Sequence, residues 1–131
     1  MASRQRPLSP HLQVYRWQVQ MVTSILHRAT GVLLSFGALL IAGAVLALLA
    51  GPDAWALTGD IASSIPGLVF LFAWVWAFAF HLLNGIRHLV QDMGLACEIP
   101  AFVMSSWISV IGSVVLTLAI FGYGAMRGGL L

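Results

Sequence analysis

Residues 81–92 read HLLNGIRHLVQD, and they close a long apolar segment of the chain. His81 lies inside that segment, where polar groups are costly and therefore usually functional. On a helix, Asn84, Gly85 and His88 would share a face with this histidine, because they follow it at i+3, i+4 and i+7. That face offers two imidazoles about 10 Å apart along the helix axis and a position without a side chain. Such a face has room for a flat cofactor that lies against Gly85 and is ligated by one histidine.

The composition is that of a membrane protein. Of the 131 residues, 60% are hydrophobic and 8% are charged, and there is no lysine; a soluble domain carries about 25% charged residues. We therefore expect a single membrane-anchor domain, residues 1–131. The net charge of +2 is too small to indicate nucleic-acid binding. The single cysteine, Cys97, excludes an internal disulfide and a thiolate metal cluster.

The order of apolar runs predicts an all-α integral membrane fold. Three transmembrane helices are expected at about 22–50, 65–92 and 101–127, since each run exceeds the roughly 20 residues needed to cross a bilayer. Two closely spaced prolines predict an extended arm over residues 1–13. Residues 51–63 are expected to form a short loop. The short chain and its extended arm favour a bundle that a partner chain completes.

The distribution of arginines predicts the orientation in the membrane. One side of the predicted spans carries Arg4, Arg6, Arg16, Arg28 and Arg87. Only Arg127 lies on the other side. Because basic residues favour the cytoplasmic side, the N-terminus is expected in the cytoplasm, or in the matrix if the protein is mitochondrial.

The first predicted helix carries a polar face of its own, near its N-terminal end. Its members are Ser24, His27, Arg28, Gly31 and Ser35. In the predicted topology this face lies at the same depth as Arg87, His88 and Asp92. A small polar ligand head in a mostly apolar slot fits such a cluster, and a quinone has carbonyls that accept hydrogen bonds from these groups.

His81 leaves several interpretations open. An intramembrane histidine can bridge helices by a hydrogen bond, relay protons or ligate a metal. If it ligates haem iron, either the haem is five-coordinate or a second chain supplies the other ligand. His88, with Arg87 or Arg28 adding charge, would then pair with a haem propionate.

Four stretches together resemble the cytochrome b membrane-anchor subunit of succinate dehydrogenase, respiratory complex II. They are residues 6–12 (RPLSPHL), the pair Tyr15-Arg16, residues 24–31 (SILHRATG) and residues 81–92. The resemblance runs from about residue 4 to the end of the chain, and the third span adds only length and topology.

The resemblance implies a function that these residues could not perform alone. The family anchors a flavoprotein subunit and an iron–sulfur subunit to the membrane together with a second hydrophobic anchor subunit, and electrons from succinate reach ubiquinone. It implies one haem b with His81 as an axial ligand and the second ligand from the partner anchor subunit. Positions near the haem propionates would be His27, Arg28 and His88. Positions at the quinone site would be Ser24, Arg28 and Asp92. No catalytic residue for succinate oxidation is expected in this chain, and the expected location is the bacterial inner membrane rather than the mitochondrial one.

Two other functions compete with this one. The first is a haem-free structural anchor, in which His81 only bridges helices. The second is a small transporter subunit, with His81, Arg28 and Asp92 as a proton path. A transporter should place polar residues in both halves of the membrane, whereas the far half of the predicted spans is almost without them.

Overall fold

Residues 16–128 fold into four helices, three of which are long enough to cross a membrane. The computed structural model describes residues 16–128, and the predicted N-terminal arm lies outside this range. The long helices are α1 (Val19–Ala50), α3 (Ile65–Asp92) and α4 (Ile99–Gly128), and each is long and apolar enough for a membrane span. The all-α fold with three spans is therefore confirmed, and α1 begins three residues before the expected start. At 1.5 Å per residue these helices are about 42–48 Å long, which exceeds a hydrocarbon core of about 30 Å.

The expected loop between the first two spans is instead a helix, α2 (Pro52–Ser63). Gly51 ends α1 with a φ of 123°, a conformation that favours glycine, and Pro52 then occupies the first turn of α2. Asp53 in that first turn interacts favourably with the helix dipole. The prediction of a loop was wrong because Gly51-Pro52 breaks one helix and also begins the next.

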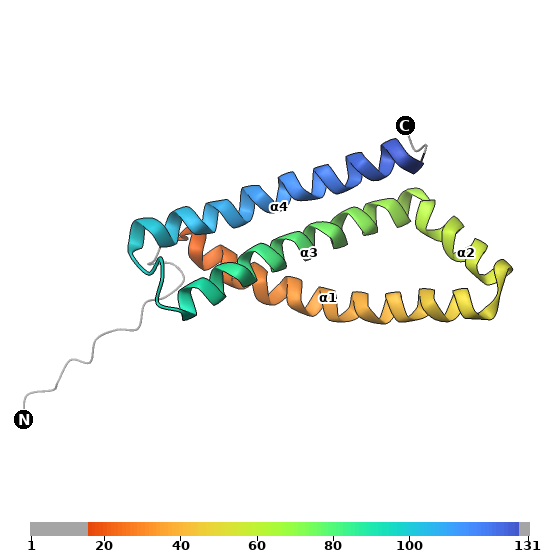
Figure 1. Ribbon diagram of the computed structural model, residues 1–131, viewed down its shortest axis with the longest axis horizontal. Coiled ribbons are helices and arrows are strands. Elements are labelled where there is room, and N and C mark those ends of the chain that lie inside the picture. Colours follow the sequence, from red (N-terminus) through yellow and green to blue (C-terminus); the bar gives the residue numbers. More distant parts are fainter. Residues whose placement is uncertain (1–15, 129–131) are drawn as a thin grey trace, which may run out of the picture.

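The helices α1 and α3 are close together at one end of the bundle and diverge toward α2, which joins them at the other end (Figure 1). α4 lies along α3 over its whole length. We call the first of these ends the histidine end, because His27, His81 and His88 lie there, and the other the α2 end. At the α2 end the diverging helices enclose an apolar cavity of about 640 Å³ that Gly37, Phe70 and Trp74 help to line.

Small side chains allow the helices to approach closely. α4 buries Ser106, Ser109, Ser113 and Thr117, which are spaced by three or four residues and so follow one face. Each of these hydroxyls donates to a backbone carbonyl of its own helix. Ser113 is fully buried, as expected for a small residue that faces another helix. Small residues are the usual means of helix association in lipid, where apolar burial gives little advantage.

Candidate functional site

His81 is held against α1 through one of its two ring nitrogens. Its Nδ1 lies 3.1 Å from the carbonyl oxygen of His27 and 3.3 Å from Oγ1 of Thr30. A carbonyl oxygen can only accept, so Nδ1 carries the proton and donates. Nε2 is then the unprotonated nitrogen, and it is neither buried nor hydrogen-bonded to any residue between 16 and 128. This is the tautomer in which Nε2 can ligate a metal.

The three histidines form one cluster with His27 in the middle, which we call the histidine stack after its one stacked pair of rings, His27 and His81. The His27 and His81 rings are nearly parallel, 10° apart, with centroids 3.9 Å apart. The His27 and His88 rings are tilted by 54°, with centroids 5.1 Å apart. The spacing of seven residues between His81 and His88 therefore does place both imidazoles on one face, and α1 inserts a third between them.

Two glycines border this stack, and they contribute differently. A Cβ at Gly31 of α1 would lie 3.0 Å from Cε1 of His81, so the absent side chain leaves room for the imidazole. A Cβ at Gly85 would meet only Cε1 of His27, at an ordinary 3.7 Å. Gly85 thus borders mostly open space beside the histidines, whereas the close approach depends on Gly31.

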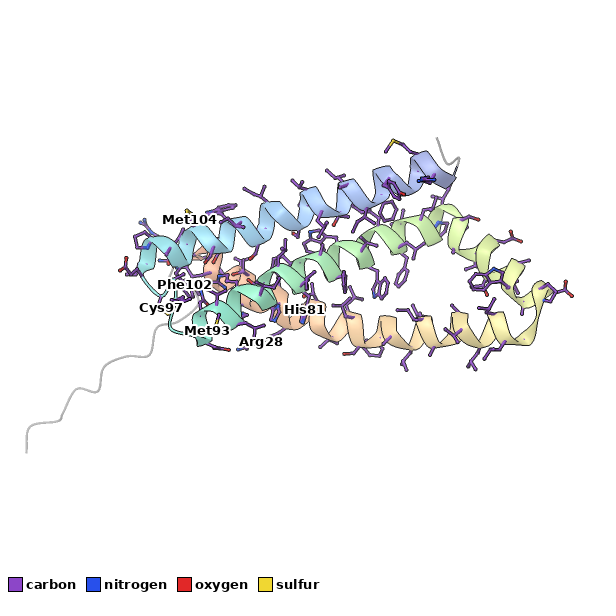
Figure 2. All side chains as sticks on the ribbon, viewed as in Figure 1. Arg28, His81, Met93, Cys97, Phe102 and Met104 are labelled. Carbon is purple, nitrogen blue, oxygen red and sulfur yellow. The ribbon has the colours of Figure 1, made fainter. Side chains whose placement is uncertain are left out.

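The residues expected at a quinone site lie on the same end of the bundle, but they are not joined to one another. Arg28 and Asp92 are exposed, and Ser24 is half-buried. No ion pair forms within residues 16–128, so Asp92 does not neutralise Arg28 there. Figure 2 shows Arg28 farther from the α2 end than His81, which lies between the ribbons of α1 and α3. Accessible polar groups at this depth are available to a ligand or to another subunit.

Arg87 does not join this cluster, contrary to the expectation that it adds charge beside His88. Its side chain is buried toward α4, where Nε donates to Oγ of Ser105 at 3.1 Å. Its guanidinium carbon lies 4.3 Å from the centre of the Phe102 ring. The two neighbours Arg87 and His88 project about 100° apart around the helix, so they face different helices.

The histidine stack does not form a complete metal site by itself. Within residues 16–128 no three side chains of histidine, cysteine, aspartate or glutamate are placed to share an ion. A metal at His81 would therefore need ligands from a planar cofactor and from outside the described part of the chain. A haem has this requirement, since its porphyrin supplies four nitrogens and the protein supplies only axial ligands.

The sequence matches the family model described as succinate dehydrogenase/fumarate reductase transmembrane subunit over residues 2–120. The chain belongs to this family. It is 43% identical to the succinate dehydrogenase cytochrome b556 subunit of Paracoccus denitrificans over 119 residues, which cover 88% of this chain and 92% of that protein. The predicted resemblance to the cytochrome b subunit of succinate dehydrogenase is thereby confirmed. Its relatives are subunits of an enzyme complex.

Mitochondrial proteins are also among the relatives of this family member. The chain is 35% identical to the mitochondrial succinate dehydrogenase cytochrome b560 subunit of Mus musculus over 126 residues, covering 95% of this chain and 71% of that protein. It is 37% identical to the cytochrome b556 subunit of Rickettsia felis over 116 residues, covering 88% and 90%. The relatives therefore come from bacteria and from mitochondria. Together with the three apolar helices, they support an inner-membrane location.

Thr30 is the site residue that the sequence interpretation missed. It is 4% exposed, and its hydroxyl lies 2.8 Å from the carbonyl of Leu26 as well as near Nδ1 of His81. The available signal was its position three residues after His27, on the same face of α1. That signal is weak, because a threonine in a membrane helix commonly bonds only to its own backbone.

Proposed function

We propose that this chain is the membrane anchor of a succinate:ubiquinone oxidoreductase and ligates one haem b through Nε2 of His81. The observation that supports this most directly is the double anchoring of Nδ1, by the His27 carbonyl and by Thr30, which leaves Nε2 accessible. The other hydrophobic anchor subunit would supply the second ligand. When bound, the haem supplies a one-electron redox centre in the membrane.

The groups around this ligand are one cation and two imidazoles that can hydrogen-bond. His27 and His88 are stacked beside His81, and Arg28 is exposed at the same end of the bundle. Cationic and hydrogen-bonding side chains stabilise propionates in a low-dielectric setting. We assign His27, Arg28 and His88 to this role.

The quinone site uses the polar groups nearest the membrane surface. Ser24 and Arg28 lie four residues apart on α1 and therefore on one face, and Asp92 ends α3 at the same end of the bundle. Ser24 and Arg28 can donate to a quinone carbonyl, while the isoprenoid tail stays in lipid. The iron–sulfur subunit, itself bound to the flavoprotein subunit, covers this end of the bundle. This end therefore faces the cytoplasm in a bacterial inner membrane.

His81→Ala tests the haem ligand. We expect the complex, purified through a tag on this chain, to lose most of its b-type haem absorbance in a dithionite-reduced minus oxidised spectrum, because no other described side chain takes the place of Nε2. Val69→Ala, at an exposed position twelve residues earlier on the same helix, serves as the control and should keep the spectrum. Unchanged haem content in His81→Ala would remove the ligand assignment and leave the anchor role intact.

Arg28→Leu tests the quinone site. Loss of a hydrogen bond from a charged donor is worth about 1.5–3 kcal/mol, so quinone reduction should fall roughly 10- to 100-fold. Electron transfer from succinate to a water-soluble dye should persist, because it does not pass through this site. Ser24→Ala should show the same pattern with a smaller loss. Equal loss of both activities would indicate failed assembly instead.

A haem-free structural anchor is the second candidate, and one observation favours it. The hydrogen bonds from His81 to His27 and Thr30 join α3 to α1, which is a structural role in its own right. In that case His81→Gln would retain assembly and every redox signal. In a haem-ligating chain, the same substitution removes the haem.

A further inference from the structure

Arg87 is a buried cation whose protein partners are all neutral. Only 5% of its surface is exposed. Its Nε donates to Ser105 and its Nη1 donates to Oδ1 of Asn84 at 3.3 Å, while the Phe102 ring lies against the guanidinium. No carboxylate pairs with it between residues 16 and 128. A buried charge without a counter-ion is costly, so an anion from outside these residues is expected.

Further unpaired donors accompany Arg87 on the same side of α3. Its own Nη2 is buried and has no acceptor in the described part of the chain, and the same is true of Nδ2 of Asn84 and Nε2 of Gln91. Because Arg87 donates to Oδ1 of Asn84, the amide nitrogen Nδ2 is the group left over. Residues 84, 87 and 91 follow one another at three and four residues, so the donors line one face. Buried donors rarely lack a partner in a complete structure.

A cavity of about 220 Å³ adjoins these groups, in the groove between α3 and α4. Arg87, Gln91, Ser105 and Ser109 line it together with apolar residues, among them Leu83 and Val90. Ile86 and Ile108 also line it and are 50% and 59% exposed, so the cavity opens to the outer surface between two apolar side chains. The site thus has a cationic interior and an apolar opening.

The depth expected for this site in the membrane indicates which class of anion binds there. Arg87 lies five residues before the end of α3, or about 8 Å along the helix, and since α3 is longer than the hydrocarbon core we expect this arginine at the level of the lipid headgroups. A phosphate group has a negative charge and several acceptor oxygens for the unpaired donors, and acyl chains suit the apolar opening. We propose that the Arg87 cavity binds the phosphodiester of a membrane phospholipid.

This site is separate from the histidine stack. Its lining comes from α3 and α4, whereas the stack lies between α1 and α3. Lipid binding there would fix the turn between α3 and α4, and it does not depend on haem or quinone binding.

The test compares phospholipid retained by the intact complex after detergent washing, measured by mass spectrometry of the extracted lipids. We expect Arg87→Leu to lose a phospholipid that the wild-type complex retains. Arg127→Leu removes an exposed arginine at the opposite end of α4 and should retain it. If Arg87→Leu fails to assemble, Ile108→Trp blocks the opening without removing a hydrogen bond, and it should lose the same lipid.

Adding either a phospholipid or inorganic phosphate shows which of the two supplies the anion. After delipidation, phosphatidylglycerol in mixed micelles should raise the melting temperature of the wild-type complex but not of Ile108→Trp, and inorganic phosphate should have no such effect. Equal stabilisation by inorganic phosphate would overturn the assignment to a lipid. Retention of the same lipid by wild type, Arg87→Leu and Ile108→Trp would overturn the site, and would indicate that water or a carboxylate of another subunit pairs with Arg87.

Discussion

The two ends of this bundle use the same helices in different ways. At the histidine end, α1 and α3 are joined by side-chain hydrogen bonds and by a stack of imidazoles. At the α2 end, the same two helices separate around an apolar cavity of about 640 Å³. A helix pair in lipid gains little from apolar contact, so the polar groups determine where the helices meet closely. The proposed functional residues therefore lie where side-chain hydrogen bonds join α1 to α3.

The largest expected difference between the two ends comes from a matched pair of glycine substitutions on α1. Gly31→Leu places a Cβ 3.0 Å from Cε1 of His81 and a larger side chain in the space of the imidazole. We expect the complex to lose most of its haem, because His81 is displaced from Thr30 and from the His27 carbonyl. The haem content per complex, from the reduced minus oxidised spectrum, measures the effect.

Gly43→Leu is the corresponding change at the α2 end. A Cβ at Gly43 has no atom within 4 Å, and this residue lines the apolar cavity. Haem content and assembly should match the wild type. If Gly31→Leu also kept its haem, the imidazole would not depend on its position against α1, and the contrast between the ends would disappear.

An intermediate effect is expected at Gly37, where the helices begin to separate. A Cβ there would lie 1.9 Å from Nε1 of Trp74, so Gly37→Ala forces the indole to move. Since Trp74 also lines the cavity, the ring has space to move into, and we expect a loss of about 1–3 kcal/mol rather than a failure to fold. The melting temperature of the purified complex reports this loss.

The double variant Gly37→Ala/Trp74→Phe tests the cause. A phenyl ring lacks the indole nitrogen nearest to the new methyl group, so most of the lost stability should return. Haem content should be unaffected in both variants. A double variant less stable than Gly37→Ala would show that the helix backbones, and not the indole, set the cost.

Most of the fold could be predicted from the sequence, because long uncharged runs and flanking arginines reflect the properties of the bilayer directly. The close placement of His27, His81 and His88 was also predictable, since it needs only helical spacing and antiparallel spans. The direction in which the Arg87 side chain points could not be predicted. It projects about 100° away from His88 around the helix, so it can face α1 or α4 depending on how those helices pack. The α2 helix was missed because proline and glycine mark the end of one helix without specifying whether a loop or a second helix comes next.

The smallest effect separates two buried threonines, one at each end. Thr30 lies beside Nδ1 of His81, whereas the hydroxyl of Thr117 donates at 2.7 Å only to the carbonyl of Ser113 in its own helix. We expect Thr30→Val to retain haem, because the His27 carbonyl still accepts from Nδ1. The haem midpoint potential should shift, by up to about 60 mV, if one hydrogen bond of about 0.5–1.5 kcal/mol no longer orients the ligand.

Thr117→Val should leave the potential and the melting temperature unchanged, since a hydroxyl bonded to its own helix contributes little. Thr30→Ser restores the hydroxyl and should restore the wild-type potential, which a general packing defect would not allow. An unchanged potential in Thr30→Val would show that the His27 carbonyl alone holds the imidazole. The distinction between the two ends would then rest on the backbone of α1 rather than on its side chains.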